Sequence, residues 1–374
     1  MKRRRTVQGG VKIRLLPLCL LVACSGTDAD DDFDPGARDA GPSLDGAVRD
    51  GGTRDAGPPR DAGPLPPDHD GGVRDGGEEP STGTWSEGPS LLAPLQETAV
   101  VALRGEVYVL GGYGTNGFGA RVEAYDPSTD QWRSVADVPA NFHHANAAVV
   151  DDKIYVVGFL VAGFQDDGRV FVYDPDTDGW TEQTAMEPQR ARGSSVVGVH
   201  DGEIYVVGGL KNAVPTADFD VYDPKTQTWR PLAPIPRAMD HGAGDIHDGK
   251  LYVAGGRAGG ISSHVPRLDI YDIATATWST GPAMPTGRAG TAGAFYDGRL
   301  FVFGGEGNGA NPPTNLFVEV EAFDVARGAW DVLAPMDPAI HGTGAAVVGD
   351  RIYLPGGATV QAFGAVDRLS VFDP

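Results

Sequence analysis

The chain has 374 residues, of which 41% are hydrophobic, and a formal net charge of −21 at pH 7. This length allows a sizeable core, while the acidic charge argues against nucleic acid or an anionic lipid surface as a partner. The two cysteines, Cys19 and Cys24, lie near the N-terminus, so the rest of the chain can form neither a disulfide nor a thiolate metal site.

The first predicted element is an export signal. Basic residues precede the apolar run from Leu15 to Ala23, which is much shorter than the roughly 20 residues needed to cross a bilayer. The segment Leu21-Val22-Ala23-Cys24 resembles the lipobox of bacterial lipoproteins. The resemblance implies cleavage before Cys24 and a lipid on its thiol. Because Ser25 and not aspartate follows Cys24, the resemblance also favours sorting of the protein to the outer membrane over retention at the inner membrane. We therefore expect a signal peptide over residues 1–23 and a lipid-anchored protein of the cell envelope.

Residues 24–82 have a low-complexity composition. The sequence RDAGP occurs at Arg38, Arg54 and Arg60, and large apolar side chains are nearly absent. Such a segment buries too little surface to offset the entropy that it would lose on ordering. We expect a disordered acidic tether, rich in Gly, Pro and Asp, that holds the following domain away from a membrane.

Six similar segments make up the rest of the chain, residues 83–374. Each contains an apolar run that ends in a glycine pair, or in Gly158-Phe159 in the second segment. The first glycines are separated by 47, 50, 47, 49 and 52 residues, and a period of this size is typical of repeat architectures. The paired glycines are Gly111 and Gly112, Gly208 and Gly209, Gly255 and Gly256, Gly304 and Gly305, and Gly356 and Gly357.

Each segment predicts four short strands. The third segment reads SSVVGVH, EIYVVGG, DFDVYDP and TWRPLA, with turn residues between the runs. Short runs rich in β-branched and aromatic residues and bounded by Asp, Gly and Pro are strand signals. The second run is apolar at nearly every position, so both of its faces should be buried. Four-stranded sheets that stack radially around an axis satisfy this requirement and protect their edges.

A glycine pair, a later Tyr-Asp or Phe-Asp, and a following Trp recur through residues 83–374. This pattern resembles the Kelch repeat, which implies an all-β, six-bladed β-propeller with four antiparallel strands per blade. The last segment has Phe372-Asp373-Pro374 without a later Trp, whereas Trp85 has no Tyr-Asp before it. We expect the N-terminal strand around Trp85 to complete blade six and close the ring.

The loops between the second and third strands are longer than the other turns within each blade. With the connections between blades, they should form the binding face. Charged residues and histidines cluster where the innermost strands begin, at the mouth of the central channel. The resemblance implies that arginines there bind acidic peptides or sugars; a purely structural role, hydrogen-bonding to carbonyl groups of neighbouring blades, is the alternative. The candidate binding residues are Arg192, Arg288, His143, His144, His241 and His341.

We favour a monomeric binding module for an envelope or extracellular protein or glycan over an enzyme. The alternative is a carbohydrate-acting enzyme that resembles the sialic-acid mutarotases, with Glu97 and Asp240 as candidate acid and base. The copper oxidases of this class need a cysteine that this part of the chain lacks. Imidazole suits Zn or Cu, but His143, His144, His241 and His341 come from three different blades. We therefore expect neither a metal nor another cofactor.

Overall fold

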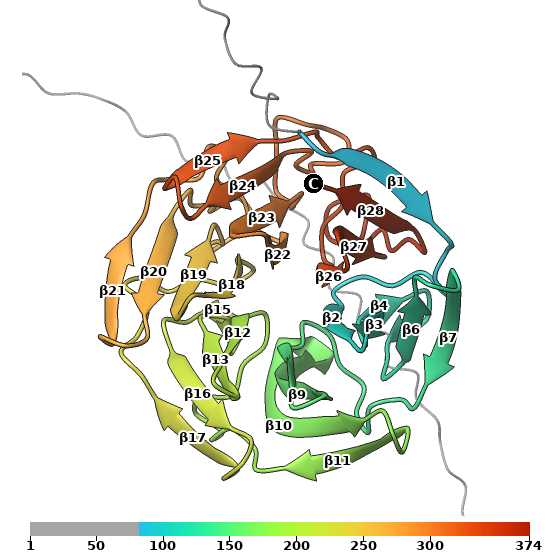
Figure 1. Ribbon diagram of the computed structural model, residues 1–374, viewed down its shortest axis with the longest axis vertical. Coiled ribbons are helices and arrows are strands. Elements are labelled where there is room, and N and C mark those ends of the chain that lie inside the picture. Colours follow the sequence, from blue (N-terminus) through green and yellow to red (C-terminus); the bar gives the residue numbers. More distant parts are fainter. Residues whose placement is uncertain (1–81) are drawn as a thin grey trace, which may run out of the picture. The chain divides into compact units, whose positions relative to one another are not determined.

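The computed structural model describes residues 82–374, so the predicted signal peptide, Cys24 and the predicted tether up to residue 81 lie outside the described residues. The described chain forms a ring of six four-stranded antiparallel sheets around a central axis (Figure 1). This arrangement confirms the predicted six-bladed propeller. Within residues 82–374, no helix has the length and apolar character needed to span a membrane.

Each blade runs from an innermost strand, a, through strands b and c to an outermost strand, d (Figure 1). Blade one contains β2 (Ala99–Leu103), β3 (Glu106–Leu110), β6 (Val122–Asp126) and β7 (Gln131–Val135). Blade two contains β8 (Ala147–Val150), β9 (Lys153–Val161), β10 (Gln165–Asp174) and β11 (Gly179–Gln183). Blade three contains β12 (Val196–His200), β13 (Glu203–Val207), β16 (Phe219–Asp223) and β17 (Thr228–Pro231).

The remaining blades follow the same order. Blade four contains β18 (Ala243–His247), β19 (Lys250–Ala254), β20 (Leu268–Asp272) and β21 (Thr277–Thr280). Blade five contains β22 (Ala292–Tyr296), β23 (Arg299–Phe303), β24 (Val320–Asp324) and β25 (Ala329–Val332). Blade six contains β26 (Ala346–Val348), β27 (Arg351–Pro355), β28 (Leu369–Asp373) and β1 (Thr84–Gly88).

The connections between strands b and c carry the only other regular elements of the described chain. They are the hairpin β4 (Tyr113–Gly114) and β5 (Gly117–Phe118), the 3-10 helix η1 (Ala162–Phe164), and the hairpin β14 (Leu210–Lys211) and β15 (Val214–Pro215). Blade two, which lacks a glycine pair, continues β9 through Phe159 as far as Val161. Phe159 is fully buried in this longer strand.

The hydrophobic core lies between the blades. Every residue from Ile204 to Val207 in β13 is buried, as the apolar second run predicts. Six clusters of buried side chains each combine residues from two neighbouring blades, including one cluster that joins blade six to blade one. Burial of both faces therefore depends on the complete ring, because a single four-stranded sheet cannot provide it.

The ring is closed by β1, the first described strand. Strand β1 pairs antiparallel with β28, and Trp85 stands opposite Phe372 with their ring centroids 4.8 Å apart. The Trp85 Nε1–H donates to the carbonyl oxygen of Ala334, in the preceding blade, at 3.0 Å. The other five tryptophans make the equivalent bond at 2.8–3.2 Å: Trp132 to Pro89, Trp180 to Ala136, Trp229 to Thr184, Trp278 to Ala233 and Trp330 to Pro282. The predicted closure is thus confirmed.

Candidate functional site

In each blade, one residue that lies two to four positions before the inner strand adopts the left-handed backbone conformation. These six residues, which we call the axial ring, have φ between 53° and 70°: Glu97, His144, Ser194, His241, Gly290 and Gly342. The backbone N–H of each donates to the backbone carbonyl of the ring residue in the preceding blade. The six hydrogen bonds form a closed cycle, so every blade contributes one side-chain position to the same short stretch of the axis.

The glycine pairs position the axial ring. The residue before each ring residue forms an antiparallel bridge with the residue that follows the glycine pair, as Asp240 does with Arg257. A Cβ atom added to Gly112 would lie only 2.3 Å from the carbonyl oxygen of Gln96, and φ of Gly112 is +89°. Only glycine tolerates this approach. The position after each glycine pair therefore lies next to the axial ring.

Three of the six ring positions carry an ionisable side chain. The left-handed conformation costs a non-glycine residue roughly 1–2 kcal/mol, yet Glu97, His144 and His241 all occupy it. One ligand atom from each of these side chains lies within 4.8 Å of the others. The three side chains are 5–11% exposed and line a cavity of about 110 Å³. We call this the polar end of the channel.

The predicted histidines meet at this end. His144 Nε2 lies 3.1 Å from Glu97 Oε2, and His144 Nδ1 lies 2.5 Å from His143 Nδ1. His341 Nδ1 is 3.7 Å from Glu97 Oε1, and His241 Nδ1 contacts Asp240 Oδ1. The sequence predicts no metal site because the four histidines belong to different blades, but all four lie in the axial ring or directly before one of its residues, which brings their side chains together.

Burial sets the protonation of the polar end. Desolvation raises the pKa of the Glu97 carboxyl group, with nearby positive groups opposing the shift. Desolvation lowers the pKa of His144 well below its usual value and that of His143 to about 4. Burial thus favours the neutral form of all three groups.

Arg257 and Glu306 are two residues of the polar end that sequence reasoning missed. Arg257 Nε lies 2.8 Å from Asp240 Oδ1, and its Nη1 lies 3.0 Å from Glu306 Oε1. The signal for both residues was their place directly after a glycine pair. In the sequence, the glycine pairs predict tight backbone geometry alone and do not point to the residue that follows.

Arg192 and Arg288 do not line the mouth of the channel, contrary to the sequence-based expectation. Both side chains are fully buried. Arg192 donates to the carbonyl groups of three residues of its own blade and pairs with Asp220 at 2.8 Å. Arg288 makes the equivalent bonds and pairs with Glu321. Both arginines therefore hold strands within their blades and are not available to a ligand.

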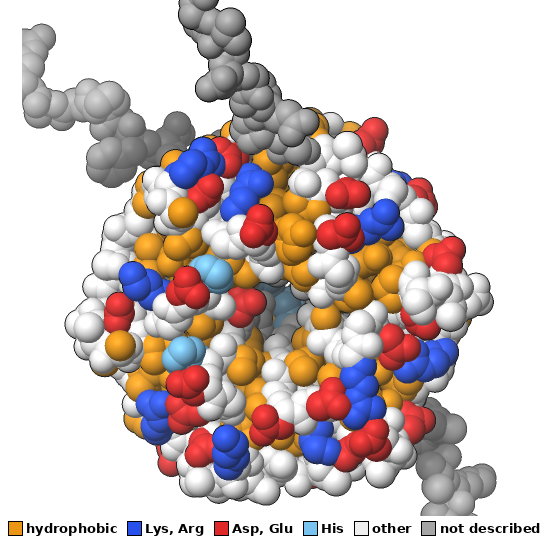
Figure 2. Space-filling model, in the orientation of Figure 1, with side chains coloured by type: hydrophobic (Ala, Val, Ile, Leu, Met, Phe, Trp, Pro, Cys, Tyr) orange, Lys and Arg blue, Asp and Glu red, His pale blue; other side chains and the backbone are white. Residues whose placement is uncertain are grey.

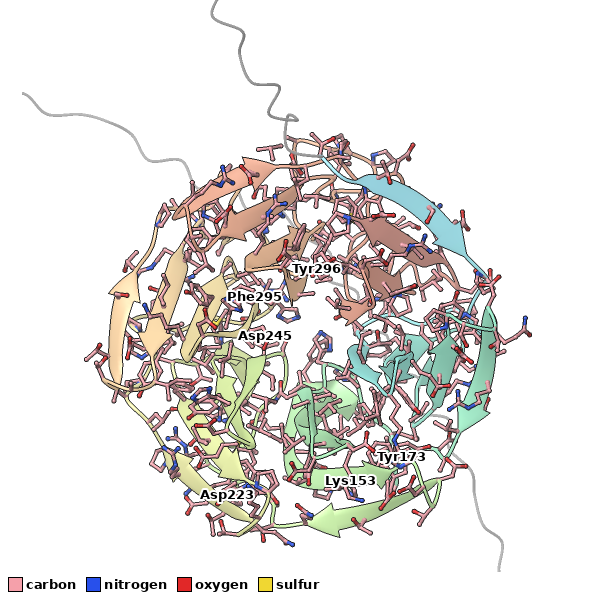
Figure 3. All side chains as sticks on the ribbon, in the orientation of Figure 1. Lys153, Tyr173, Asp223, Asp245, Phe295 and Tyr296 are labelled. Atoms are coloured by element: carbon pink, nitrogen blue, oxygen red, sulfur yellow. The ribbon has the colours of Figure 1, made fainter. Side chains whose placement is uncertain are left out.

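The rest of the channel is lined mainly by small and apolar side chains. A cavity of about 420 Å³ is lined by the inner strands of all six blades, largely by Val, Ala and Gly. Figure 2 shows the hollow at the centre of the ring. Asp245, Phe295 and Tyr296 are labelled close to this centre in Figure 3. Asp245 is the one ionisable residue among those lining the cavity, and burial raises its pKa to about 6.

Aromatic side chains from three b–c loops gather beside the polar end. The loop-face aromatic patch comprises Tyr113, Phe118, Phe164 and Phe363. The Tyr113 ring centroid is 5.6 Å from those of Phe118 and Phe363. The His143 ring contacts Tyr113 at 4.6 Å and Phe164 at 5.1 Å. Phe363 is 68% exposed, which is unusual for so large an apolar side chain.

Comparisons with known proteins agree with the repeat architecture. The model of the KLHDC2/KLHL20/DRC7 Kelch-repeats domain matches residues 147–357, and that of the Kelch motif matches residues 94–139. Kelch-like protein terF of Aspergillus terreus is 34% identical over 321 residues, covering 79% of this chain and 69% of terF. Kelch-like protein 35 of Mus musculus is 30% identical over 151 residues, covering 40% of this chain and 25% of its own length.

One solved structure supports the same fold. The structure of YjhT aligns with a TM-score of 0.65 at 18% sequence identity, covering 75% of this chain and 95% of YjhT. At this identity the likeness concerns the fold alone. The extent of the family match and the similarity to terF establish that the chain belongs to the Kelch-repeat family.

Proposed function

We propose that this Kelch propeller is an interaction module that binds a protein partner through the face formed by the b–c loops and the connections between blades. Membership of the Kelch-repeat family supports a protein-interaction role in general. The observation that carries the proposal is the distribution of exposed apolar side chains. Of the seven large ones within residues 82–374, six belong to this face: Leu92, Phe164, Val214, Val318, Val360 and Phe363.

The loop-face aromatic patch is the best anchor for such a partner. Aromatic side chains supply large contact areas and dominate the binding energy of many interfaces. The exposed rings of Phe164 and Phe363 flank Tyr113 and His143, which are themselves packed together. A partner that covers this patch would remove apolar surface from water next to the polar end, where an ionic group of the partner could also be recognised.

The proposed location of the module is the cell envelope, with Cys24 as the lipid attachment site. This part of the proposal rests on the basic and apolar start of the chain and on the Leu21-Val22-Ala23-Cys24 segment, which lie outside the described residues. Several acyl chains anchor a protein firmly. Residues 25–82 would then present the propeller at a distance from the membrane.

Metabolic labelling with radioactive palmitate tests the lipid attachment at Cys24. The wild-type chain should incorporate label and the Cys24→Ser variant should not.

The binding face is tested by cross-linking in cells followed by affinity purification of the propeller. A Phe164→Ser/Phe363→Ser variant should lose the partner that the wild-type chain retains. Val332→Ser is the matched control, because Val332 is 65% exposed but lies in the outer strand β25. Retention of the same partner by the double variant, or equal loss in the control, would contradict the proposal. A partner identified as a glycan would also contradict it.

A carbohydrate-acting enzyme is a second candidate, and one observation favours it. Glu97 is a carboxyl group with a raised pKa beside His144, as acid–base catalysis requires. However, the cavity of about 110 Å³ is smaller than the roughly 300–1,000 Å³ of small-molecule sites. Arg192 and Arg288, the arginines expected to bind acidic peptides or sugars at the mouth, are buried. NMR measurement of sialic-acid mutarotation tests this candidate function. A rate no higher than the uncatalysed background would exclude it.

A further inference from the structure

We propose that Glu97, His144 and His241 bind one divalent transition-metal ion of the zinc class at the polar end of the channel. The three side chains offer two imidazole nitrogens and one carboxylate oxygen within 4.8 Å of one another. This donor set is typical of Zn²⁺ sites that keep a further coordination position open. Mg²⁺ and Ca²⁺ prefer sites made of oxygen ligands alone.

The hydrogen bonds of His143 leave His144 with a lone pair that points at a carboxylate. His143 Nε2 lies 3.2 Å from the carbonyl oxygen of Val161 and must donate to it. Its Nδ1 is then an acceptor, so His144 Nδ1, 2.5 Å away, is the donor. His144 Nε2 therefore presents a lone pair to Glu97 Oε2 at 3.1 Å. Two acceptors this close repel each other unless a proton or a metal ion lies between them.

The separation of these two atoms suits a shared ion. Bonds of roughly 2.0–2.1 Å to a tetrahedral Zn²⁺ place two ligand atoms about 3.3 Å apart. Glu97 Oε2 and His144 Nε2 lie 3.1 Å apart. The widest separation in the triad, no more than 4.8 Å, has to contract by about 1.5 Å, which small side-chain rotations can supply. The cavity of about 110 Å³ has room for an ion with a water molecule.

His241 has the supporting contacts of a metal ligand. Its Nδ1–H donates to Asp240 Oδ1, which leaves the lone pair of the neutral ring on Nε2. A carboxylate in this position fixes the tautomer and raises the basicity of a ligating imidazole. Arg257 Nη2 is 3.2 Å from both ring nitrogens of His241. Because Arg257 Nη2 is equally far from Nδ1 and Nε2, it does not lie along the direction of the Nε2 lone pair.

His341 provides an independent observation that points to a ligand. Its side chain is completely buried, and its Nε2 lies 3.1 Å from the carbonyl oxygen of Val360, to which it must donate. Its Nδ1 lone pair has no hydrogen-bond partner, although it lies 3.7 Å from Glu97 Oε1 and 3.5 Å from Glu306 Oε2. A water molecule on the open position of a bound ion would satisfy this lone pair.

The charge of the polar end matches a divalent ion. A bound metal ion takes Glu97 as a carboxylate and the imidazoles in their neutral form. The carboxylates of Glu97, Asp240 and Glu306 are then opposed only by Arg257 among the ion pairs of this cluster. Without the ion, such a cluster would carry two uncompensated negative charges on largely buried side chains, which is unfavourable. A divalent cation neutralises both charges. It also connects blades one, two and four across the axis.

The test uses the full-length protein, stripped of metal with EDTA and titrated with ZnCl₂ by calorimetry and with CoCl₂ by visible absorption. The wild-type chain should bind one equivalent of Zn²⁺ above background, and Co²⁺ should give the d–d bands of a site with nitrogen ligands. His144→Ala/His241→Ala should weaken Zn²⁺ binding at least about 100-fold, because outer-shell changes alone cost 10–100-fold. Excess Mg²⁺ should not displace Zn²⁺ or Co²⁺.

Two further variants make the test decisive. His200→Ala/His247→Ala removes two histidines outside the polar end, each 32% exposed and paired with the next aspartate, and should bind Zn²⁺ like the wild type. Glu97→Gln keeps the size of the side chain and should lose the Co²⁺ bands while its circular dichroism spectrum is unchanged. Equal Zn²⁺ binding by the wild type and His144→Ala/His241→Ala would overturn the proposal. Absence of Co²⁺ bands in the wild type would also overturn it, since a shared proton would then occupy the gap.

Discussion

The two parts of the central channel are built from the same six inner strands but differ in chemistry. The larger part is lined mainly by Val, Ala and Gly, whereas the polar end holds Glu97, His144 and His241. The difference arises from single positions at the start of each inner strand, where the left-handed conformation aims a side chain at the axis. A repeat protein can thus assemble a site at the axis by changing one residue per blade, with no change in the strands.

Opening the ring should have the largest effect, because it disrupts both parts of the channel. Deleting residues 83–90 removes β1 and with it the pairing of Trp85 with Phe372. The apolar faces of blades five and six would be exposed, and the melting temperature should fall by more than about 10 °C. Deleting residues 25–80 is the control and should leave the melting temperature nearly unchanged, as their low-complexity composition predicts. Equal melting of the two truncated chains would contradict the closure.

The next largest effect concerns the arginines that lie behind the polar end. Arg288→Met leaves the buried carboxylate of Glu321 without its partner, which should cost about 3–5 kcal/mol of stability in urea unfolding. Arg230→Met is the control, since Arg230 is 50% exposed in its pair with Glu203, and should cost less than about 1 kcal/mol. If Arg288 instead served a ligand at the mouth, its replacement would leave stability unchanged.

Asp245 tests the apolar part of the channel through its pH dependence. Its pKa is raised to about 6 in the fold by burial, against about 3.9 in an unfolded chain. Because the folded state holds this proton up to a higher pH than the unfolded chain, the contribution of Asp245 to the free energy of unfolding is greatest below about pH 4. This contribution falls as the pH rises to about 6. Asp245→Asn should remove that fall and gain about 1–3 kcal/mol at pH 7. An unchanged pH profile of urea unfolding would show that the channel is well hydrated.

The smallest effect compares two glycines with left-handed backbones. Gly342 (φ +65°) belongs to the axial ring, and an added Cβ would lie 2.7 Å from Glu97 Oε1. Gly349 (φ +64°) has nothing within 4 Å of an added Cβ. Both alanine variants should lose about 1 kcal/mol, but only Gly342→Ala should weaken Zn²⁺ binding, because it displaces Glu97. Equal Zn²⁺ binding by the two variants would show that Glu97 is not a ligand of the metal ion.

The sequence predicted the fold well because the repeat period is a local pattern. The spacing of Trp85 from the later tryptophans was sufficient to place β1 in blade six. Spacing was not sufficient to place Arg192 and Arg288. Three successive residues precede each inner strand: the first points into the blade, the second pairs with the neighbouring loop, and the third faces the axis. Pattern alone assigned all three positions to the mouth of the channel.

The polar end was less predictable for a different reason. Glu97, His144 and His241 are remote in sequence, and only the cycle of backbone hydrogen bonds brings them within 4.8 Å. Arg257 and Glu306 are not predictable in this way, because strand geometry alone accounts for the glycine pair before each of them. In a propeller, the residue after such a pair deserves the same scrutiny as the start of the inner strand.

The most direct test of the difference between the two parts of the channel is a crystal structure of the full-length protein grown with Zn²⁺, with data collected at the zinc absorption edge. The account predicts one strong anomalous peak bonded to Glu97, His144 and His241. A peak at Asp245 in the apolar part, or none between these three side chains, would contradict it.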